Sequence, residues 1–408
     1  DLVGISLSCE EGLACYIPLR HGQKLDDNQS DFNFDNVKSF NQIHFEDAIE
    51  LLKPILEDKS ILKIGHNIKF DALVIKQLHN DYSSIFLLVD TNTQEYCLPL
   101  FLDKIKFLRD KPVITIGAGE FNKHLETCKQ VWNQLSELGA DRKSLLINLG
   151  GGVVTDLGGF VAAAFRRGID FINIPTTLLS MVDASVGGKT GVDLEGLKNQ
   201  IGIMTNPELV VIDPIYLKTL PDNEYRSGYA EMLKHGIIRD AEYFKKLSKY
   251  QSFEDIDIPD KIHHSVSIKN SVVRTDPSEK YLRKILNFGH TLGHAIESYF
   301  LANSSKKNLL HGEAIAIGMI LEAYLSFRIT GLSIESAREI KSVFLSIFSR
   351  IHFKEEDVKS IISLLKYDKK NSYGKVKFVL LEEIGKPIID IELGNENLSS
   401  AFDFYEAD

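Results

Sequence analysis

The sequence is poor in the features that mark secreted or membrane-bound chains. Its 408 residues include only four cysteines, Cys9, Cys15, Cys97 and Cys128, without a CxxC pair, so we expect reduced thiols in a cytoplasmic protein. No apolar run approaches the roughly 18 residues that a membrane span needs. The opening DLVGISLSCEEG has neither a basic start nor an apolar core, so we expect no signal peptide. Because it also lacks an initiator Met, we expect a truncated start.

An excess of basic residues is missing too. Lysine and arginine number 47 against 57 acidic residues, for a net charge of -10, and charged residues make up 25% of the chain. This balance argues against a general nucleic-acid or anionic-membrane binder, which would carry a basic footprint. A small anionic substrate stays possible, because a local basic cluster can occur in an acidic protein.

The chain length and the order of patterns predict three parts. Short strands at 2–7, 14–18 and 61–65 and helices at 46–56 and 69–79 precede a polar break at 80–84. Strands at 84–90, 113–119, 144–149, 170–175 and 209–213 then alternate with helices at 122–138 and 156–167, which predicts a parallel sheet. Amphipathic stretches follow at 223–250, 256–275, 283–300, 312–330 and 333–348. We therefore expect domains at 1–80, 82–218 and 219–408, the last α-helical.

A glycine-rich turn, LGGGVVTDLGGF (149–160), follows a predicted strand and opens a helix. Glycines let the backbone approach a phosphate, and the helix N-terminus supplies N–H donors. The turn lacks the GxGxxG spacing, so a tight strand-to-helix turn without a ligand is the alternative interpretation.

Histidines gather in the predicted helical domain. His290 and His294 in NFGHTLGHAIE lie four residues apart and hence on one helix face. His311 stands at the entrance of the next helix, and GYAEMLKHG offers Glu231. One carboxylate with two or three histidines is typical of a catalytic zinc site. A single histidine is more often a surface or capping residue, so the clustering carries the hypothesis.

Several basic residues stand beside glycine or asparagine, as in GGK (187–189) and LKN (197–199). They could bind an anionic substrate or simply lie on the surface. Taken singly, a lysine is most often a solvated surface residue.

Eight ordered motifs between about 83 and 393 resemble the 3-dehydroquinate synthase family. They include GEFNK (119–123), GGGVVTDLGGFVAA (150–163), GGKTGVD (187–193), GLKNQIG (196–202), YAEMLKHG (229–236), LNFGHTLGHAIE (286–297) and LHGEAIAIGM (310–319). The resemblance implies an α/β fold: a Rossmann-like N-terminal domain and a C-terminal all-α domain, with the active site between them. It implies conversion of 3-deoxy-D-arabino-heptulosonate 7-phosphate into 3-dehydroquinate and phosphate, a step of the shikimate route to chorismate and the aromatic amino acids, with NAD and zinc or cobalt as cofactors.

The resemblance also implies the roles of individual residues. The metal ligands would be Glu231, His290 and His311, with His294 as a polar group near the substrate rather than a ligand. The catalytic and substrate-binding residues would be Asp183, Lys189, Lys198, Asn199, Lys234, Lys269, Arg283, Asn287 and one of Lys369 and Lys370. Arg167 would reach a neighbouring subunit, which implies a homodimer. NAD would contact Asp90, Asn92, Glu120, Lys123, Gly151, Gly152, Val153, Asp156, Thr176, Thr177, Tyr216 and Thr219.

Some positions depart from the family pattern. Pro277 and Tyr281 stand where many members have Glu and Gly, and Tyr281 precedes Arg283 closely enough to affect its presentation. Asp193 replaces a frequent Asn. The strands and helix that normally precede SIFLLVD are missing, which leaves NAD binding open.

The first eighty residues instead resemble a partial ribonuclease H-like fold, the 3′–5′ exonuclease domain of bacterial DNA polymerase I. HNIKFD supplies one metal-binding aspartate, Asp71. The partner carboxylate motifs are absent, and a single carboxylate cannot hold two metal ions, so we expect no nuclease activity. The junction suggests a recombined or misassembled reading frame, with an inactive chimera as one alternative. Another sugar phosphate cyclase is the alternative enzyme, and a nuclease or nucleic-acid-binding protein is the alternative from another class.

Overall fold

The computed structural model describes residues 4–10, 13–18, 47, 50, 82–195, 197–249, 258–303, 306–365 and 376–407. The chain forms two compact units, Asp1–Lys63 and Ile64–Asp408. In the first unit, β1 (Gly4–Glu10) pairs antiparallel with β2 (Leu13–Pro18), close to the strands predicted at 2–7 and 14–18. The strand expected at 61–65 and the helix expected at 69–79 lie outside the described residues.

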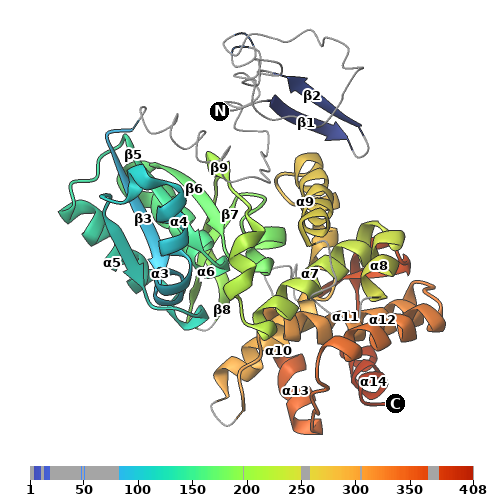
Figure 1. Ribbon diagram of the computed structural model, residues 1–408. Helices are drawn as coiled ribbons and strands as arrows, with labels where there is room; N and C mark the ends of the chain where they lie inside the picture. The colour runs from blue at the N-terminus through green and yellow to red at the C-terminus, as the bar shows by residue number, and fades with distance from the viewer. Residues whose placement is uncertain are drawn as a thin grey trace, which may run out of the picture. The chain divides into compact units, whose positions relative to one another are not determined.

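A five-stranded parallel sheet organises the first part of the second unit (Figure 1). Its strands are β3 (Ser84–Asp90), β4 (Val113–Ile116), β5 (Ser144–Gly150), β6 (Asp170–Pro175) and β9 (Leu209–Val210). They lie in the order β4-β3-β5-β6-β9. The chain therefore leaves β3 in one direction and β5 in the other, which makes the β3/β5 boundary the switch point where ligands of such sheets bind.

Helices cover this sheet, and a hairpin packs against those helices. The helices are α3 (Thr91–Tyr96), α4 (Leu98–Lys104), α5 (Leu125–Glu137) and α6 (Gly152–Ala164), and the hairpin is β7 (Lys189–Leu194) with β8 (Leu197–Met204). Phe86, Ile114, Val131, Leu146 and Leu157 share one buried core between β3, β4, β5, α5 and α6. Strands β3, β5 and β6 are largely apolar and almost entirely buried, as expected of parallel sheets covered on both faces.

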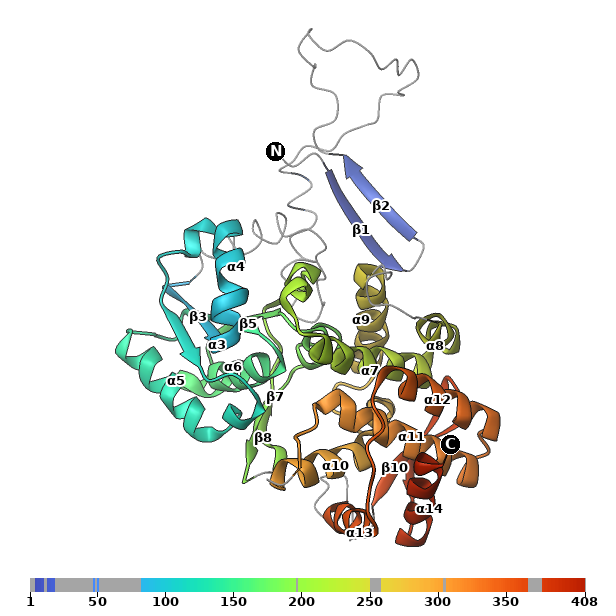
Figure 2. The same ribbon diagram turned by 60° about the horizontal axis from the view of Figure 1, so that its bottom comes forward.

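The second part is mostly helical (Figure 2). It contains α7 (Asp222–Arg239), α8 (Ala241–Ser248), α9 (Ile258–Thr275), α10 (His290–Ala302), α11 (His311–Ile329), α12 (Ile334–Ile347), α13 (Glu355–Leu364) and α14 (Asn395–Glu406). The antiparallel hairpin of β10 (Lys377–Glu383) and β11 (Lys386–Glu392) interrupts the helices. None of the described helices is long and apolar enough to cross a membrane.

The predicted helix boundaries need two corrections in this part. The stretch at 223–250 is two helices, because Asp240 ends α7 in an extended conformation and its carboxylate caps α8 by accepting Tyr243 N–H at 2.9 Å. The stretch at 283–300 begins as a 3₁₀ turn, Leu282–Asn287, and the α-helix starts only at His290 after Gly289, whose φ is +79°. Periodicity alone does not detect such breaks. The hairpin of β10 and β11 is also absent from the sequence expectation.

A buried carboxylate joins α10 to α13. Asp357 accepts the Tyr299 hydroxyl at 2.5 Å, Lys306 Nζ at 2.6 Å and the Lys354 amide at 2.9 Å. Burial opposes its ionisation, but these donors outweigh it and lower the pKa of Asp357 to about 2.

We expect Asp357→Asn to lower the free energy of unfolding by about 1–3 kcal/mol, since it weakens hydrogen bonds to a charged group. The pKa of Asp357 is depressed in the folded state, so its contribution is present above the unfolded value near 3.8 and is lost as the pH falls toward 2. Urea unfolding between pH 7 and 3 measures this difference. Glu356→Gln, an exposed neighbour, is the control. Equal unfolding curves for D357N and E356Q at pH 7 would contradict the expectation.

Candidate active site

One large cleft lies beside the carboxyl ends of the parallel strands. Its volume is about 1380 Å³, and residues of both the sheet part and the helical part of the second unit line it. All twelve residues expected to contact NAD line this cleft, as do the expected catalytic and substrate-binding residues Asp183, Lys189, Lys198, Asn199, Lys234, Lys269, Arg283, Asn287 and His294. Lys369 and Lys370 lie outside the described residues.

The glycine turn sits at the sheet's switch point, as the sequence predicts. Helix α6 begins at Gly152 directly after β5, and no side chain caps it. Asp90 ends the neighbouring strand β3, and its carboxylate accepts the Thr93 amide at 2.8 Å, capping α3. The N-terminus of α6 therefore faces the cleft with its N–H groups available for an anion.

Lys123 makes buried polar contacts at this edge of the sheet. Its Nζ lies 2.7 Å from Asp156 Oδ2 and 2.7 Å from Asn199 Oδ1. Burial disfavours the ammonium, but Asp156 and Glu120 outweigh that cost and raise the pKa of Lys123. Lys123 and Asp156, expected at the nucleotide, thus bind each other across η3 (Glu120–Asn122) and α6.

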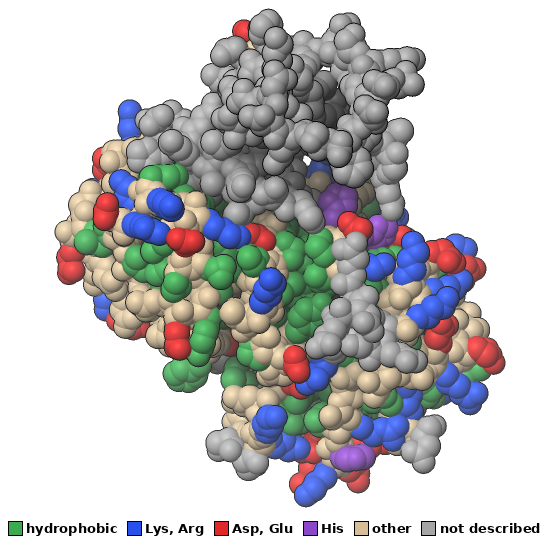
Figure 3. Space-filling model, viewed as in Figure 1, with side chains coloured by type: hydrophobic (Ala, Val, Ile, Leu, Met, Phe, Trp, Pro, Cys, Tyr) green, Lys and Arg blue, Asp and Glu red, His purple; other side chains and the backbone are tan. Residues whose placement is uncertain are grey.

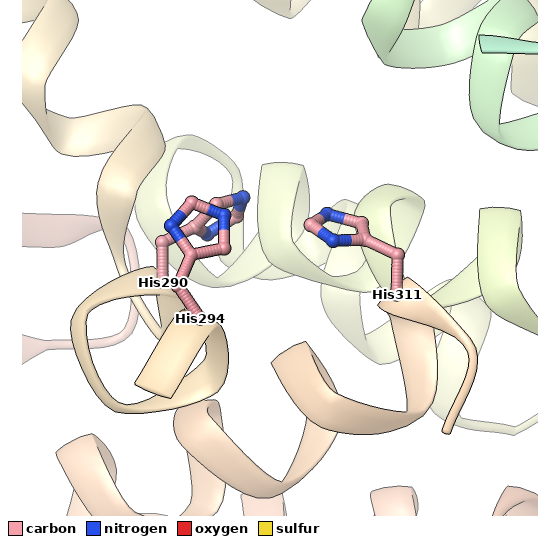
Figure 4. A group of neighbouring side chains, drawn as sticks. All are labelled: His290, His294 and His311. Carbon is pink, nitrogen blue, oxygen red and sulfur yellow. The ribbon is translucent and has the colours of Figure 1, made fainter. Parts of the chain in front are cut away.

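Three histidines point toward one another at the other wall of the cleft (Figure 4). His290 and His294 extend from α10 and His311 from the first residue of α11, and one ring nitrogen of each lies within 4.8 Å of the others. Beneath them, fully buried Glu231 on α7 places Oε1 at 3.6 Å from His290 Nε2 and 3.9 Å from His311 Nε2. The structure thus brings together the three expected metal ligands, and His294 beside them.

Hydrogen bonds fix which ring nitrogens face Glu231. A carbonyl can only accept, so His290 Nδ1–H donates to Phe288 O at 3.1 Å, and His311 Nδ1 likewise lies 3.1 Å from Glu297 Oε2. The Nε2 atoms of the neutral rings are then acceptors that face a carboxylate oxygen. Neither Glu231 oxygen has a hydrogen bond among the described residues, and only an ion pair from Lys234 reaches Oε2. Three facing acceptors fit a divalent cation.

Most of the predicted basic residues are buried, contrary to the usual fate of lysine. Lys234 and Arg283 are 1% and 2% exposed, and Lys198 and Lys269 are also largely enclosed. Each has a partner: Lys269 Nζ lies 2.7 Å from Asp183 Oδ1, and Lys189, half-exposed, lies 2.5 Å from Glu279 Oε2. Burial raises the cost of ionising Asp183, yet Lys269 and Lys234 keep its pKa well below the usual range.

The turn at residues 276–283 fixes the position of Arg283. The carboxylate of Asp276 accepts the backbone amides of Lys280, Tyr281 and Arg283 at 3.1, 2.7 and 3.0 Å. The guanidinium donates to Pro277 O at 2.9 Å and Gly187 O at 2.7 Å. Tyr281, which stands where many family members have glycine, is 72% exposed and contributes its backbone amide to this turn.

The sequence interpretation did not identify three residues of the site, Glu279, Asp276 and Glu297. Glu279 binds Lys189 and accepts Asn287 Nδ2–H at 2.8 Å. Glu297 lies seven residues after His290, and this two-turn spacing places it on the same helix face. That spacing is the one signal that could have identified it.

Family models match most of the second unit. The model for the N-terminal part of 3-dehydroquinate synthase matches residues 113–227, and the model for its C-terminal part matches residues 228–371. The chain is 41% identical over 330 residues to the 3-dehydroquinate synthase of Parabacteroides distasonis, covering 79% of this chain and 92% of that one. The chain belongs to the 3-dehydroquinate synthase family.

Other comparisons agree. The 3-dehydroquinate synthase of Dictyoglomus thermophilum is 38% identical over 86% of this chain and 98% of its own. The structure of 2-epi-5-epi-valiolone synthase from Streptomyces hygroscopicus, with NAD⁺ and Zn²⁺ bound, has a TM-score of 0.72 at 23% identity and covers 91% of this chain and 99% of that one. A 2-deoxy-scyllo-inosose synthase with NAD⁺ and Co²⁺ has a TM-score of 0.69 at 23% identity, covering 84% and 95%. These two show the shared fold.

The N-terminal segment also has a match. A model for 3′-5′ exonucleases matches residues 1–98, which confirms the predicted resemblance and extends it past the polar break at 80–84. Strand β3 nevertheless pairs with β4 and β5 inside the synthase sheet. Hydrogen bonding therefore assigns residues 84–90 to the synthase part.

We expect Asp276→Asn to lower the melting temperature, because a neutral amide holds the three backbone N–H groups less strongly. Tyr281→Ala, which changes an exposed side chain of the same turn, is the control and should melt like the unchanged protein. Backbone N–H donors keep the pKa of Asp276 low despite burial, so the difference should shrink as the pH falls below about 4. Calorimetry at pH 7 and pH 3 tests this, and a larger effect from Y281A would refute the role of Asp276.

Proposed function

We propose that this chain catalyses the conversion of 3-deoxy-D-arabino-heptulosonate 7-phosphate to 3-dehydroquinate and phosphate, as a carbon–oxygen lyase that uses NAD and a divalent metal ion. The observation that supports this most directly is the convergence of Glu231, His290 and His311 on one point of a cleft lined by buried cations. Its relatives at 41% and 38% identity are 3-dehydroquinate synthases, whereas the cyclases of known structure are 23% identical.

The metal ligands in this proposal are Glu231, His290 and His311, with zinc or cobalt as the ion. We assign His294 to the substrate rather than to the metal, although its ring nitrogen is close enough to those of His290 and His311 to share an ion with them. NAD binds along the edge from Asp90 to Thr219, with its phosphates at the N-terminus of α6. When bound, the cation would polarise a substrate hydroxyl and the nicotinamide would accept and return a hydride.

The basic residues of the cleft bind and orient the anionic substrate. Arg283 offers its Nε–H, which is buried and has no hydrogen bond among the described residues. Lys189 is the most exposed of the group and can exchange Glu279 for a phosphate oxygen. Lys269 is fixed by Asp183, and burial together with Lys234 and Arg283 lowers the pKa of Lys269. Such preset charges stabilise anions that develop during elimination and ring closure.

Arg167 lies away from the cleft. Its side chain is exposed, and its φ of 69° holds the backbone in the left-handed region, a strained conformation that persists only where the surroundings fix it. We propose that it completes the site of a second copy of this chain in a homodimer, and that the enzyme acts in the cytoplasm.

We expect the protein, supplied with NAD and Zn²⁺, to release phosphate from the heptulosonate phosphate. His290→Ala and Glu231→Gln should each reduce this release by at least 100-fold, because each removes one of the facing ligand atoms. His263→Ala, an exposed histidine on α9, is the control. Phosphate release that survives both substitutions, or that resists a chelator, would refute the assignment.

We expect no nuclease activity from the N-terminal segment. Labelled single-stranded DNA incubated with the full chain and Mg²⁺ or Mn²⁺ should stay intact, because Asp71 is the only one of the family's metal-binding carboxylates identified there. Degradation that disappears in Asp71→Ala would show that expectation to be wrong.

A further inference from the structure

Glu297 occupies a place between the histidine cluster and the sheet part of the unit. It lies on α10, seven residues after His290, and is 7% exposed. A carboxylate this buried needs partners on both oxygens. Its two oxygens reach in different directions, one toward α11 and one toward the hairpin of β7 and β8.

The first oxygen determines the tautomer of His311. Glu297 Oε2 lies 3.1 Å from His311 Nδ1, and a carboxylate can only accept, so the proton resides on Nδ1. Nε2 then keeps its lone pair, and it faces Glu231 Oε1 at 3.9 Å. At His290 the corresponding acceptor is a backbone carbonyl, which a substitution does not remove, whereas at His311 it is the side chain of Glu297.

The second oxygen holds a lysine from the other wall of the cleft. Glu297 Oε1 lies 3.1 Å from Lys198 Nζ on β8, and the same ammonium lies 2.5 Å from Glu120 Oε1 on η3. Glu120 is itself 3.8 Å from Lys123, the residue that binds Asp156 at the start of α6. A continuous series of ion pairs therefore leads from His311 to the glycine turn. Burial disfavours the charge on Glu297, but His311 and Lys198 outweigh it and lower its pKa.

We propose that Glu297 is a positioning residue that fixes the cation-binding tautomer of His311 and, through Lys198, links metal binding to the nucleotide edge of the sheet. This inference rests on the proposed metal site. Because coupling between two binding sites is reciprocal, NAD and metal should each strengthen the binding of the other through this link.

The test is titration of the metal-free protein with Co²⁺, followed by visible absorption, with and without NAD. Glu297→Gln should weaken Co²⁺ binding by about 10- to 100-fold, as expected for a partner of a metal-binding histidine. Glu224→Gln, a glutamate of α7 that lines the same cleft, is the matched control and should bind Co²⁺ normally. Lys198→Met should abolish the enhancement by NAD, measured as the ratio of the Co²⁺ affinities of that variant with and without NAD.

A second measurement does not depend on a folded variant. In metal-free, unsubstituted protein labelled with ¹⁵N-histidine, His311 should show the neutral Nδ1–H tautomer near pH 8. A His311 with its proton on Nε2, or E297Q with unchanged Co²⁺ affinity, would overturn the inference while leaving the proposed function intact. Unsubstituted protein that binds no Co²⁺ would overturn the metal site itself, and this inference with it.

Discussion

Everything in the site depends on one buried carboxylate. Glu231 is fully enclosed on α7, and its Oε1 faces two imidazole nitrogens that are themselves acceptors. A buried charge without compensation costs several kcal/mol, and the ammonium of Lys234 lies at the other oxygen of Glu231. The fold therefore concentrates acceptors around a point where a divalent cation would relieve the repulsion between them. The same cation would tie α7, α10 and α11 together.

Close helix packing makes this convergence possible. A Cβ on Gly318 of α11 would lie 2.0 Å from the carbonyl oxygen of Gly289, and one on Gly312 would lie 2.3 Å from Ser227 O on α7. Glycine at these positions lets the backbones approach closely enough for short side chains to share one ion. Close helix packing therefore explains the glycines in the motifs around the histidines, without any catalytic role for the glycines themselves.

The sequence allowed prediction of those parts of the molecule that local patterns determine. The alternation of strands and helices identified the parallel sheet, and the i, i+4 spacing of His290 and His294 identified the histidine face of α10. Residues joined only by the tertiary fold escaped prediction. Asp276 acts through three backbone amides, and Glu279 through a lysine ninety residues earlier in the chain, so neither leaves a periodic signal. Burial of Lys234 likewise follows from packing, since residue type alone favours the surface.

The acidic net charge of -10 is compatible with a cleft suited to an anion. The net charge sums over the whole chain, whereas binding in the cleft depends on the charges that lie next to the ligand. On the face shown in Figure 3, basic and acidic side chains are interspersed over the described surface. Within the cleft, the lysines are held by carboxylates that also cancel their field at a distance: Glu279 for Lys189, Asp183 for Lys269, and Glu120 with Glu297 for Lys198. An anion gains from these cations only when it enters and displaces a carboxylate oxygen at short range, where the local dielectric is low. Attraction is therefore confined to a ligand small enough to enter the cleft, and long anionic polymers gain little from it.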